Sequence, residues 1–494
     1  MSQSSLPDQP PREDPGASEP LPGVPAPSSA ELSSNGPNEP GVGGGNGKVG
    51  NGRVGNGRAR ALVAGAVAAA VALAAVGFFM VYSDEENGGG KSDSKDAAEQ
   101  GKELFKIKAP EVPAGEAGVW LRGAWVTDEI YARTTTFGVT GMDPVSGKPK
   151  WELQLDGLIC HASERISTSG KTAVLMTGTE SAQSKCNRLV VFDVDSGKKE
   201  WQKTLRAGDV VQDNQVSVTV SQDVVAVRWG RRGVGAYKIS GGSLLWKARQ
   251  DSKCLHDSFA GGKELTAVVT CDGIISTPET RVQKLDPETG RPTWEFKIPG
   301  NRRAAQIVSS DPVVATVGAN MMVVGEDREL KSTISLKKHN PGCRADSESC
   351  LSAVVDDTYL YVPSTDHRSD NGSFSNAVVA FDLNTGKPRW KSGSGKRRLI
   401  EPLRMEGGKL IAYKKPTYDN GGEIVAIDPA EKGKQELLLR NPDDRQNVEH
   451  GFTRTTHEER PLYENGRLYL QWSMLSENFE DGLGKYIGAA FGLK

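Results

Sequence analysis

The side chains best able to carry chemistry in this chain of 494 residues are its six cysteines and six histidines. The histidines are His161, His256, His339, His367, His450 and His457. They are scattered, and no His-x-x-x-His or His-Glu-x-x-His spacing pairs two of them on a metal. The sequence also has no Gly-x-Ser-x-Gly turn, no Walker loop and no credible nucleophile–base pair. We therefore assign no catalytic, cofactor-binding or metal-binding residue, and we predict that the protein is not an enzyme.

The cysteines indicate disulfides rather than a zinc site. They are Cys160, Cys186, Cys254, Cys271, Cys343 and Cys350. No Cys-x-x-Cys pair occurs among them, whereas an even count suits a disulfide framework. Aligned on the repeats described below, they pair as Cys160–Cys186, Cys254–Cys271 and Cys343–Cys350. His161 and His256 closely follow a cysteine at corresponding repeat positions, which indicates a structural role for both.

One acidic loop carries oxygen atoms of the kind that bind calcium. It runs from Asp366 to Gly372 and includes Asp370 and Asn371. It lacks the spaced acidic pattern of a known calcium loop. We interpret it as a solvated insertion and predict no metal there.

Short repeats must position all these residues. The phrase from Asp286 to Phe296, Asp-Pro-Glu-Thr-Gly-Arg-Pro-Thr-Trp-Glu-Phe, recurs with changes at 143–151, 193–201 and 382–390, and more weakly at 239–246. The tryptophans at 151, 201, 246 and 294 are 50, 45 and 48 residues apart. A period of this length is typical of a β-propeller with one blade per repeat.

Each part of the phrase has a mechanical role in a hairpin. The aspartate bonds the amides ahead of it, the glycine takes a positive φ, and the tryptophan packs between neighbouring blades. The blade-motif residues are Asp143, Gly147, Trp151, Asp193, Gly197, Trp201, Trp246, Asp286, Gly290, Trp294, Asp382, Gly386 and Trp390. Blade packing accounts for these tryptophans without a cofactor.

Eight such units can be counted, so the predicted fold is an all-β, eight-bladed propeller, with seven blades as the alternative. The second strands are predicted to begin near Val126, Thr172, Val224, Leu265, Val313, Tyr359, Leu410 and Leu468. The eighth unit ends before a fourth strand, while the segment 104–110 resembles an outer strand without its own hairpin. We predict that residues 104–108 complete the last blade and close the ring.

The region before the repeats predicts a membrane anchor. Residues 1–58 form a Pro/Gly-rich tail that we expect to be disordered. Residues 59–82 are assigned as a transmembrane helix, because the 22 residues from Ala61 to Tyr82 carry no charge. Basic residues precede this stretch and acidic residues follow it, which predicts a cytoplasmic N-terminus and an extracytoplasmic propeller. A linker then spans 83–102, and the propeller 103–494; a cleaved signal peptide is the alternative reading of the apolar stretch.

The overall charge of the chain excludes few classes of binding partner. The formal net charge is −2 at pH 7. The sequence shows no basic stripe with interleaved aromatic residues, so no nucleic-acid partner is expected.

The repeats resemble those of the quinoprotein-type β-propeller family, also called pyrroloquinoline-quinone-like repeats. The layout of tail, single span and propeller resembles membrane proteins of actinobacteria. This resemblance implies either a quinone-dependent dehydrogenase or a non-enzymatic propeller such as that of the outer-membrane barrel-assembly machinery. The dehydrogenases pair the quinone and a calcium ion with adjacent cysteines and a catalytic aspartate. No two cysteines are adjacent here, so neither quinone nor calcium is expected.

The sequence therefore favours a membrane-anchored, extracytoplasmic propeller that binds a protein or cell-envelope ligand as a non-catalytic scaffold. A quinone-dependent enzyme and a ligand sensor that signals through a membrane partner are the alternatives. Three long insertions are the expected contact loops, at 365–375, 414–422 and 441–460. The identity of the ligand and the face that binds it do not follow from the sequence.

Overall fold

The computed structural model describes residues 100–181, 184–205, 216–229, 233–248, 253–271, 279–300, 304–343, 348–368, 374–453, 461–476 and 486–493. The chain divides into two compact units, Met1–Gly89 and Gly90–Lys494, and the repeats lie in the second. The predicted tail and membrane span fall outside the described residues. Within those residues, no helix is long and apolar enough to cross a membrane.

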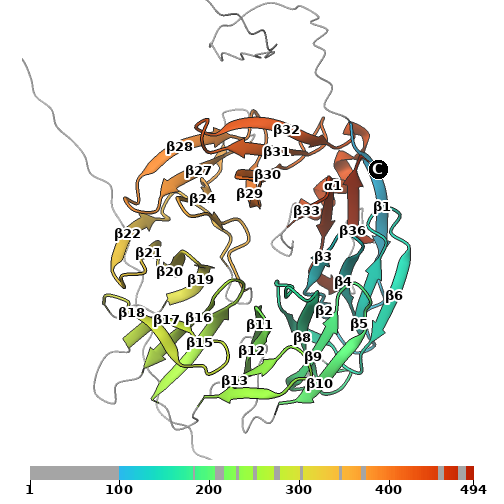
Figure 1. The fold of residues 1–494 in the computed structure, drawn as a ribbon. Helices are drawn as coiled ribbons and strands as arrows, with labels where there is room; N and C mark the ends of the chain where they lie inside the picture. Colours follow the sequence, from blue (N-terminus) through green and yellow to red (C-terminus); the bar gives the residue numbers. More distant parts are fainter. Residues whose placement is uncertain are drawn as a thin grey trace, which may run out of the picture. The chain divides into compact units, whose positions relative to one another are not determined.

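The described strands form eight four-stranded antiparallel sheets around a ring (Figure 1), so the eight-bladed, all-β prediction is confirmed and the seven-bladed alternative is wrong. We number these sheets blades 1 to 8 in chain order. In each blade the chain runs outward from an inner strand near the axis to an outer strand at the rim.

The strands of the first four blades are given from the inside outward. Blade 1 holds β3 (Ala124–Val126), β4 (Tyr131–Thr135), β5 (Gly138–Met142) and β6 (Pro149–Gln154). Blade 2 holds β7 (Ile159–Ala162), β8 (Lys171–Thr177), β9 (Cys186–Asp193) and β10 (Lys199–Thr204). Blade 3 holds β11 (Val216–Ser221), β12 (Val224–Trp229), β13 (Gly233–Lys238) and β14 (Leu244–Lys247). Blade 4 holds β15 (Cys254–Ala260), β16 (Leu265–Cys271), β17 (Glu279–Leu285) and β18 (Pro292–Lys297).

The other four blades follow the same order, with one exchange at the end. Blade 5 holds β19 (Ala304–Ser310), β20 (Val313–Val317), β21 (Asn320–Val324) and β22 (Leu330–Ser335). Blade 6 holds β23 (Val354–Val355), β24 (Tyr359–Pro363), β27 (Ala377–Asp382) and β28 (Pro388–Gly393). Blade 7 holds β29 (Ile400–Glu406), β30 (Lys409–Lys414), β31 (Glu423–Asp428) and β32 (Lys434–Arg440). Blade 8 holds β33 (Leu462–Glu464), β34 (Arg467–Gln471), β36 (Tyr486–Gly492) and β1 (Lys102–Lys108).

Further elements lie between these strands. Two short two-stranded sheets pair β2 (Gly118–Trp120) with β35 (Met474–Ser476) and β25 (His367–Arg368) with β26 (Phe374–Ser375). A 3-10 turn, η2 (Asp443–Arg445), leads into the helix α1 (Gln446–Thr453).

The burial of each strand explains its sequence pattern. Middle strands such as β12 are covered by blades on both sides, and five of its six residues are buried. Such strands therefore read as continuous apolar runs. Outer strands such as β28 alternate between exposed and buried residues, because only one of their faces meets a neighbouring blade.

The predicted start of the second strand is wrong in blade 1. The strand begins at Tyr131, while Val126 ends the inner strand β3. The turn between them lies at 127–130, where the Thr127 hydroxyl accepts the Ile130 amide at 3.1 Å. A threonine turn without Gly or Asn is a weak signal, so the two strands could not be separated from the sequence.

The ring is closed by the start of the described chain, as predicted. Strand β1 pairs antiparallel with β36, from Lys102 opposite Gly492 to Lys108 opposite Tyr486. Two contacts also join blade 8 to blade 1. The rings of Tyr131 and Tyr469 stack at 4.4 Å between centroids, and the buried Arg133 Nη1 donates to the Ile487 carbonyl at 2.6 Å.

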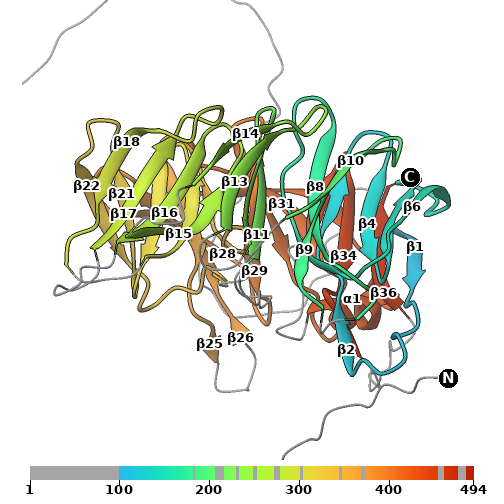
Figure 2. The ribbon, with the colours of Figure 1, turned by 90° about the horizontal axis from the view of Figure 1, so that it is seen from below.

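Successive connections alternate between the two faces of the ring. One face carries the turns between first and second strands and the signature hairpins between third and fourth strands; we call it the hairpin face. The opposite face, which we call the loop face, carries the connections between second and third strands and between blades. Figure 2 shows β2, α1 and the β25–β26 hairpin together on this face. All three insertions predicted as contact loops therefore share the loop face.

Candidate functional site

The aspartates of the blade motif hold their own hairpins. Asp143 Oδ1 accepts hydrogen bonds from the amide and the hydroxyl of Ser146, both at 2.8 Å. The same pair of bonds recurs at Asp193, Asp286 and Asp382. These bonds to the charged form lower the pKa of Asp143 and Asp286. Each of these carboxylates is therefore engaged in its own turn.

The glycine of one hairpin and the tryptophan of the preceding blade form one contact. A Cβ built on Gly242 would lie 2.6 Å from Cδ2 of Trp201, and one on Gly290 would lie 2.5 Å from Cδ2 of Trp246. Each ring thus packs on the bare backbone of the next hairpin. Where blade 8 meets blade 1, the Phe105 ring of β1 packs on Gly147 in the way that tryptophan rings pack on other hairpins.

The indole N–H groups add a repeated hydrogen bond between blades. Trp201 Nε1 donates to the Ile239 carbonyl at 2.7 Å, and Trp246 Nε1 donates to the Pro287 carbonyl at 2.9 Å. At the closure, the Tyr469 hydroxyl donates in the same way to a hairpin carbonyl of blade 1, at 3.0 Å. The motif residues thus join blade to blade.

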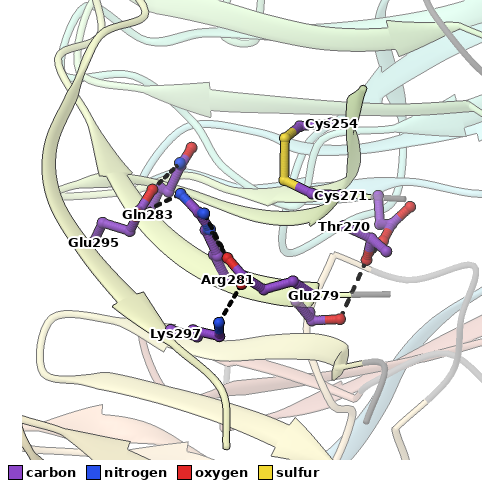
Figure 3. Close-up of a disulfide and its surroundings, with 10 residues drawn as sticks. Cys254, Thr270, Cys271, Glu279, Arg281, Gln283, Glu295 and Lys297 are labelled. Atoms are coloured by element: carbon purple, nitrogen blue, oxygen red, sulfur yellow. Dashed lines mark hydrogen bonds and ion pairs between the residues drawn. A yellow bond between two sulfur atoms is a disulfide. The ribbon is translucent and has the colours of Figure 1, made fainter. Parts of the chain in front are cut away.

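The three predicted disulfides are formed. They join Cys160 to Cys186, Cys254 to Cys271 and Cys343 to Cys350. Figure 3 shows the second, which links opposite residues of β15 and β16. Close by, Arg281 of β17 contacts Glu279 at 2.5 Å and Glu295 at 2.8 Å. Glu279 lies in the same strand as Arg281, whereas the pair with Glu295 joins β17 to β18.

The third disulfide closes a loop that crosses the ring. This axial loop, described at residues 336–343 and 348–353, connects β22 of blade 5 to β23 of blade 6 and reaches the middle of the ring in Figure 1. Its Glu348 reaches blades 2 and 3. Glu348 Oε2 accepts the Glu164 amide at 2.7 Å, and Oε1 accepts the hydroxyl of Thr219. Blades 2 and 6 face each other across an eight-bladed ring, so the loop spans the channel.

Glu348 and Glu164 exchange hydrogen bonds. The Glu348 amide donates to Glu164 Oε1 at 3.2 Å, and the Ser349 hydroxyl donates to Glu164 Oε2 at 2.7 Å. Burial raises the pKa of Glu348 to about 8, with a further rise from the charge of Glu164 and an opposing effect of Arg165. The loop tip is thus held by a buried carboxyl that is mainly protonated at neutral pH.

The other end of the axial loop is bonded to the loop face. The Asn340 amide donates to the Pro363 carbonyl at 3.0 Å, and the Thr365 amide donates to the Lys338 carbonyl at 2.9 Å. Residues 338–340 therefore lie against the stem of the β25–β26 hairpin.

Two of the predicted contact loops form one unit. Glu449 of α1 is fully buried, and its carboxylate accepts the Tyr413 hydroxyl at 2.8 Å, the Gly422 amide at 2.9 Å and the Asn441 amide group at 2.9 Å. Burial raises the pKa of Glu449 to about 7. The loop at 415–422 is thus fixed to the segment 441–453, and it presents Tyr418 with 83% of its surface exposed.

The third contact loop contains the candidate calcium segment. His367 and Arg368 form β25 and are exposed, while 369–373 lie outside the described residues. The candidate oxygen ligands at 370 and 371 are among those five. Across the hairpin, the Arg368 guanidinium lies 5.9 Å from the centre of the half-exposed Phe374 ring.

The structure places the two cysteine-adjacent histidines in inner strands. His161 lies in β7 and is 4% exposed. His256 lies in β15, stacks on Phe259 at 5.5 Å, and has its pKa lowered to about 4 by burial. Among the described residues, no group of three or more His, Cys, Asp or Glu side chains is arranged to hold a metal ion.

Sequence reasoning did not single out Glu348 or Glu449. One signal for Glu348 was available, because it lies inside the short loop closed by Cys343 and Cys350. A buried position cannot be read from one glutamate in a polar loop, so Glu449 carried no signal.

These features define a class: closed β-propellers in which several blades carry an Asp-x-x-Ser/Thr-Gly hairpin followed by a tryptophan. A family model described as outer membrane protein assembly factor BamB, of pyrroloquinoline-quinone-like repeats, matches residues 95–276 and 137–392. The matched ranges cover more than half of the chain, which therefore belongs to this family of propellers. No curated protein matches the chain.

Many solved structures are similar to the chain at low identity. BamB from Moraxella catarrhalis is 14% identical, with a TM-score of 0.43 over 76% of this chain and 98% of that one. A quinohemoprotein alcohol dehydrogenase from Pseudomonas putida is 12% identical, with a TM-score of 0.43 over 76% of this chain and 75% of that one. A europium-containing methanol dehydrogenase is 11% identical, with a TM-score of 0.43 over 79% of this chain and 92% of that one.

The described axial carboxylates are already engaged in hydrogen bonds within the protein. Both oxygens of Glu348 already accept hydrogen bonds from Glu164 and Thr219. Both oxygens of Glu164 accept bonds from the axial loop. A metal ion held by these carboxylates would have to displace the present donors.

Proposed function

We propose that the protein is a membrane-anchored, extracytoplasmic propeller that binds a protein or cell-envelope ligand on its loop face and carries out no catalysis. The axial loop is the observation that carries this proposal. Because residues 336–353 cross the channel and Glu348 is bonded on its far side, the channel axis is taken by the chain's own residues. Binding is then left to the outer surfaces.

The distribution of insertions selects the loop face. The signature hairpins on the opposite face are short and repeat one geometry. The loop face carries the β25–β26 hairpin, the fixed pair of 415–422 and 441–453, and two exposed aromatic side chains, Phe374 and Tyr418. Loops on a rigid scaffold are where binding residues concentrate. The family name also supports a binding role, since it describes an assembly factor rather than an oxidoreductase.

The test compares exposed apolar residues on the two faces. Phe374 and Tyr418 on the loop face are 49% and 83% exposed; Leu244 and Leu330, at the hairpin face, are 54% and 38% exposed. Tagged full-length protein is used to capture ligands from solubilised cell envelope. We expect the F374A/Y418A variant to lose the captured component and the L244A/L330A variant to keep it.

Loss of capture in the hairpin-face variant alone would overturn the choice of face. Quinone reduction by the purified protein in the presence of calcium would overturn the non-catalytic assignment.

A further inference from the structure

The loop face of blades 6 and 7 gathers cations that are far apart in the sequence. Four segments contribute to it: 337–340, 364–368, 374–376 and 394–400. The exposed cations among the described residues of these segments are Lys337, Lys338, Arg368, Lys396 and Arg397. We call these five residues the basic patch. The whole chain has a net charge of −2, so the patch is a local excess.

Hydrogen bonds between these segments show that they touch. Lys338 adjoins one leg of the β25–β26 hairpin, because its carbonyl accepts the Thr365 amide at 2.9 Å. On the other leg, the Asn376 carbonyl accepts the Ser394 amide at 3.0 Å, and the Asn376 amide donates to the Ser394 hydroxyl at 3.2 Å. The Asn376 side-chain oxygen accepts the Ile400 amide at 2.7 Å. The patch therefore runs from one leg of the hairpin to the other.

Few carboxylates compensate the patch. Among the described residues, Lys337, Lys338 and Lys396 make no ion pair. Arg397 lies 3.9 Å from Asp419, and both side chains are more than half exposed. Asp366 is the other exposed acid of the described patch segments. By contrast, the neighbouring Arg398 is 10% exposed and lies 2.8 Å from Glu423, a carboxylate that Lys414 and Arg440 also contact. Because Arg398 is largely buried, we leave it out of the patch.

Aromatic rings border these cations. Phe374 lies under the Arg368 guanidinium. Tyr418 is exposed and adjoins Asp419, which Arg397 contacts. Beyond Tyr418 the exposed residues are of mixed charge, because Asp443 and Asp444 are followed by Arg445, which contacts Asp444 at 3.9 Å. The patch thus has a defined end on the side of α1.

We propose that the basic patch binds an extended polyanionic chain bearing phosphate groups, as found in charged cell-envelope polymers. Guanidinium forks and ammonium groups bind phosphate oxygens, and exposed rings provide flat apolar contacts for sugar units. This proposal rests on the proposed function, since it names the ligand class of the same face.

The shape of the face favours a flexible chain over a bilayer. The β25–β26 hairpin projects from the loop face in Figure 2. Lys337 and Lys338 lie beside one leg of its base, and Lys396 lies beside the other. A flat surface would meet β25 and β26 before the cations at their base, whereas a chain can follow that base.

The test measures binding of inorganic polyphosphate to the full-length protein in zwitterionic-lipid nanodiscs. The patch variant is K337Q/K338Q/R368Q/K396Q. The matched control removes four exposed cations from signature hairpins of the opposite face, as K148Q/K198Q/R291Q/K387Q. We expect salt-dependent binding that falls by at least about tenfold in the patch variant and by less than about twofold in the control.

Three outcomes would overturn the proposal. Equal losses in the two variants would mean non-specific attraction. Equal affinity for polyglutamate would remove the preference for phosphate. Binding to phosphatidylglycerol vesicles but not to polyphosphate would assign the patch to a lipid surface. Ligand capture that depends on Phe374 and Tyr418 and persists in the patch variant would leave the proposed function standing while this inference fails.

Discussion

Replacing Glu348 by glutamine should change how the stability of the propeller depends on pH. The carboxyl has a pKa near 4.5 when unfolded and about 8 in the folded ring. Between these values the native state keeps a proton that the unfolded chain releases, so stability is fully present below pH 4.5 and falls as the pH rises towards 8. Each pH unit in this window costs about 1.4 kcal/mol.

From pH 6 to pH 9 this single group therefore lowers the free energy of unfolding by about 3 kcal/mol. Glutamine is isosteric and cannot ionise. Its carbonyl can accept the Glu164 amide while its amide group donates to the Thr219 hydroxyl, in place of the present bonds. We expect E348Q to keep the loop docked and to lose this part of the pH dependence.

The assay is urea unfolding followed by tryptophan fluorescence at pH 6 and pH 9, with the disulfides intact. Glu449 titrates in the same window, but it is present in both proteins, so its contribution cancels in the difference. The control is E129Q, at a carboxylate that is 78% exposed. If E348Q lost as much stability between the two pH values as the unmodified protein, the buried position of Glu348 would be refuted.

Three further substitutions test the packing of the ring. Gly241 and Gly242 both have a positive φ, but a Cβ on Gly241 meets open space whereas one on Gly242 meets the Trp201 ring. We expect G241A to lower the free energy of unfolding by about 1 kcal/mol and G242A by about 2–4 kcal/mol, measured by urea unfolding. Similar losses in the two variants would contradict the contact with Trp201. We expect W294A, at a residue that is 6% exposed, to cost about 3–5 kcal/mol, which a change below 1 kcal/mol in the same assay would contradict. We expect E449A to leave three donors unsatisfied and to increase hydrogen exchange of the Gly422 amide by at least about tenfold, and unchanged exchange would count against this anchor.

The repeat signature made most of the fold predictable. The distance between tryptophans set the blade count, and the spare strand at 104–108 matched the strand missing at the C-terminus. These signals are local or periodic, so they can be recognised in a single sequence. The start of the second strand in blade 1 could not be recognised, because the Thr127 turn contains no Gly or Asn to mark it.

The candidate site depended on contacts between distant segments. Glu348 contacts Glu164 although the two residues are 184 positions apart, and the residues around either one give no sequence signal of this contact. The basic patch was missed for the same reason, since its cations come from separate short segments that only the blade connections bring together. The sequence predicted the contact loops but not the face that they share, which follows from the alternation of the strands.

The most direct test of the proposed function is site-specific photo-cross-linking in living cells. A photoreactive amino acid replaces Tyr418 on the loop face or Leu244 at the hairpin face, and both positions are more than half exposed. We expect the probe at Tyr418 to form a discrete adduct with an envelope component and the probe at Leu244 to form none. An adduct from Leu244 alone, or none from either position, would contradict binding through the loop face.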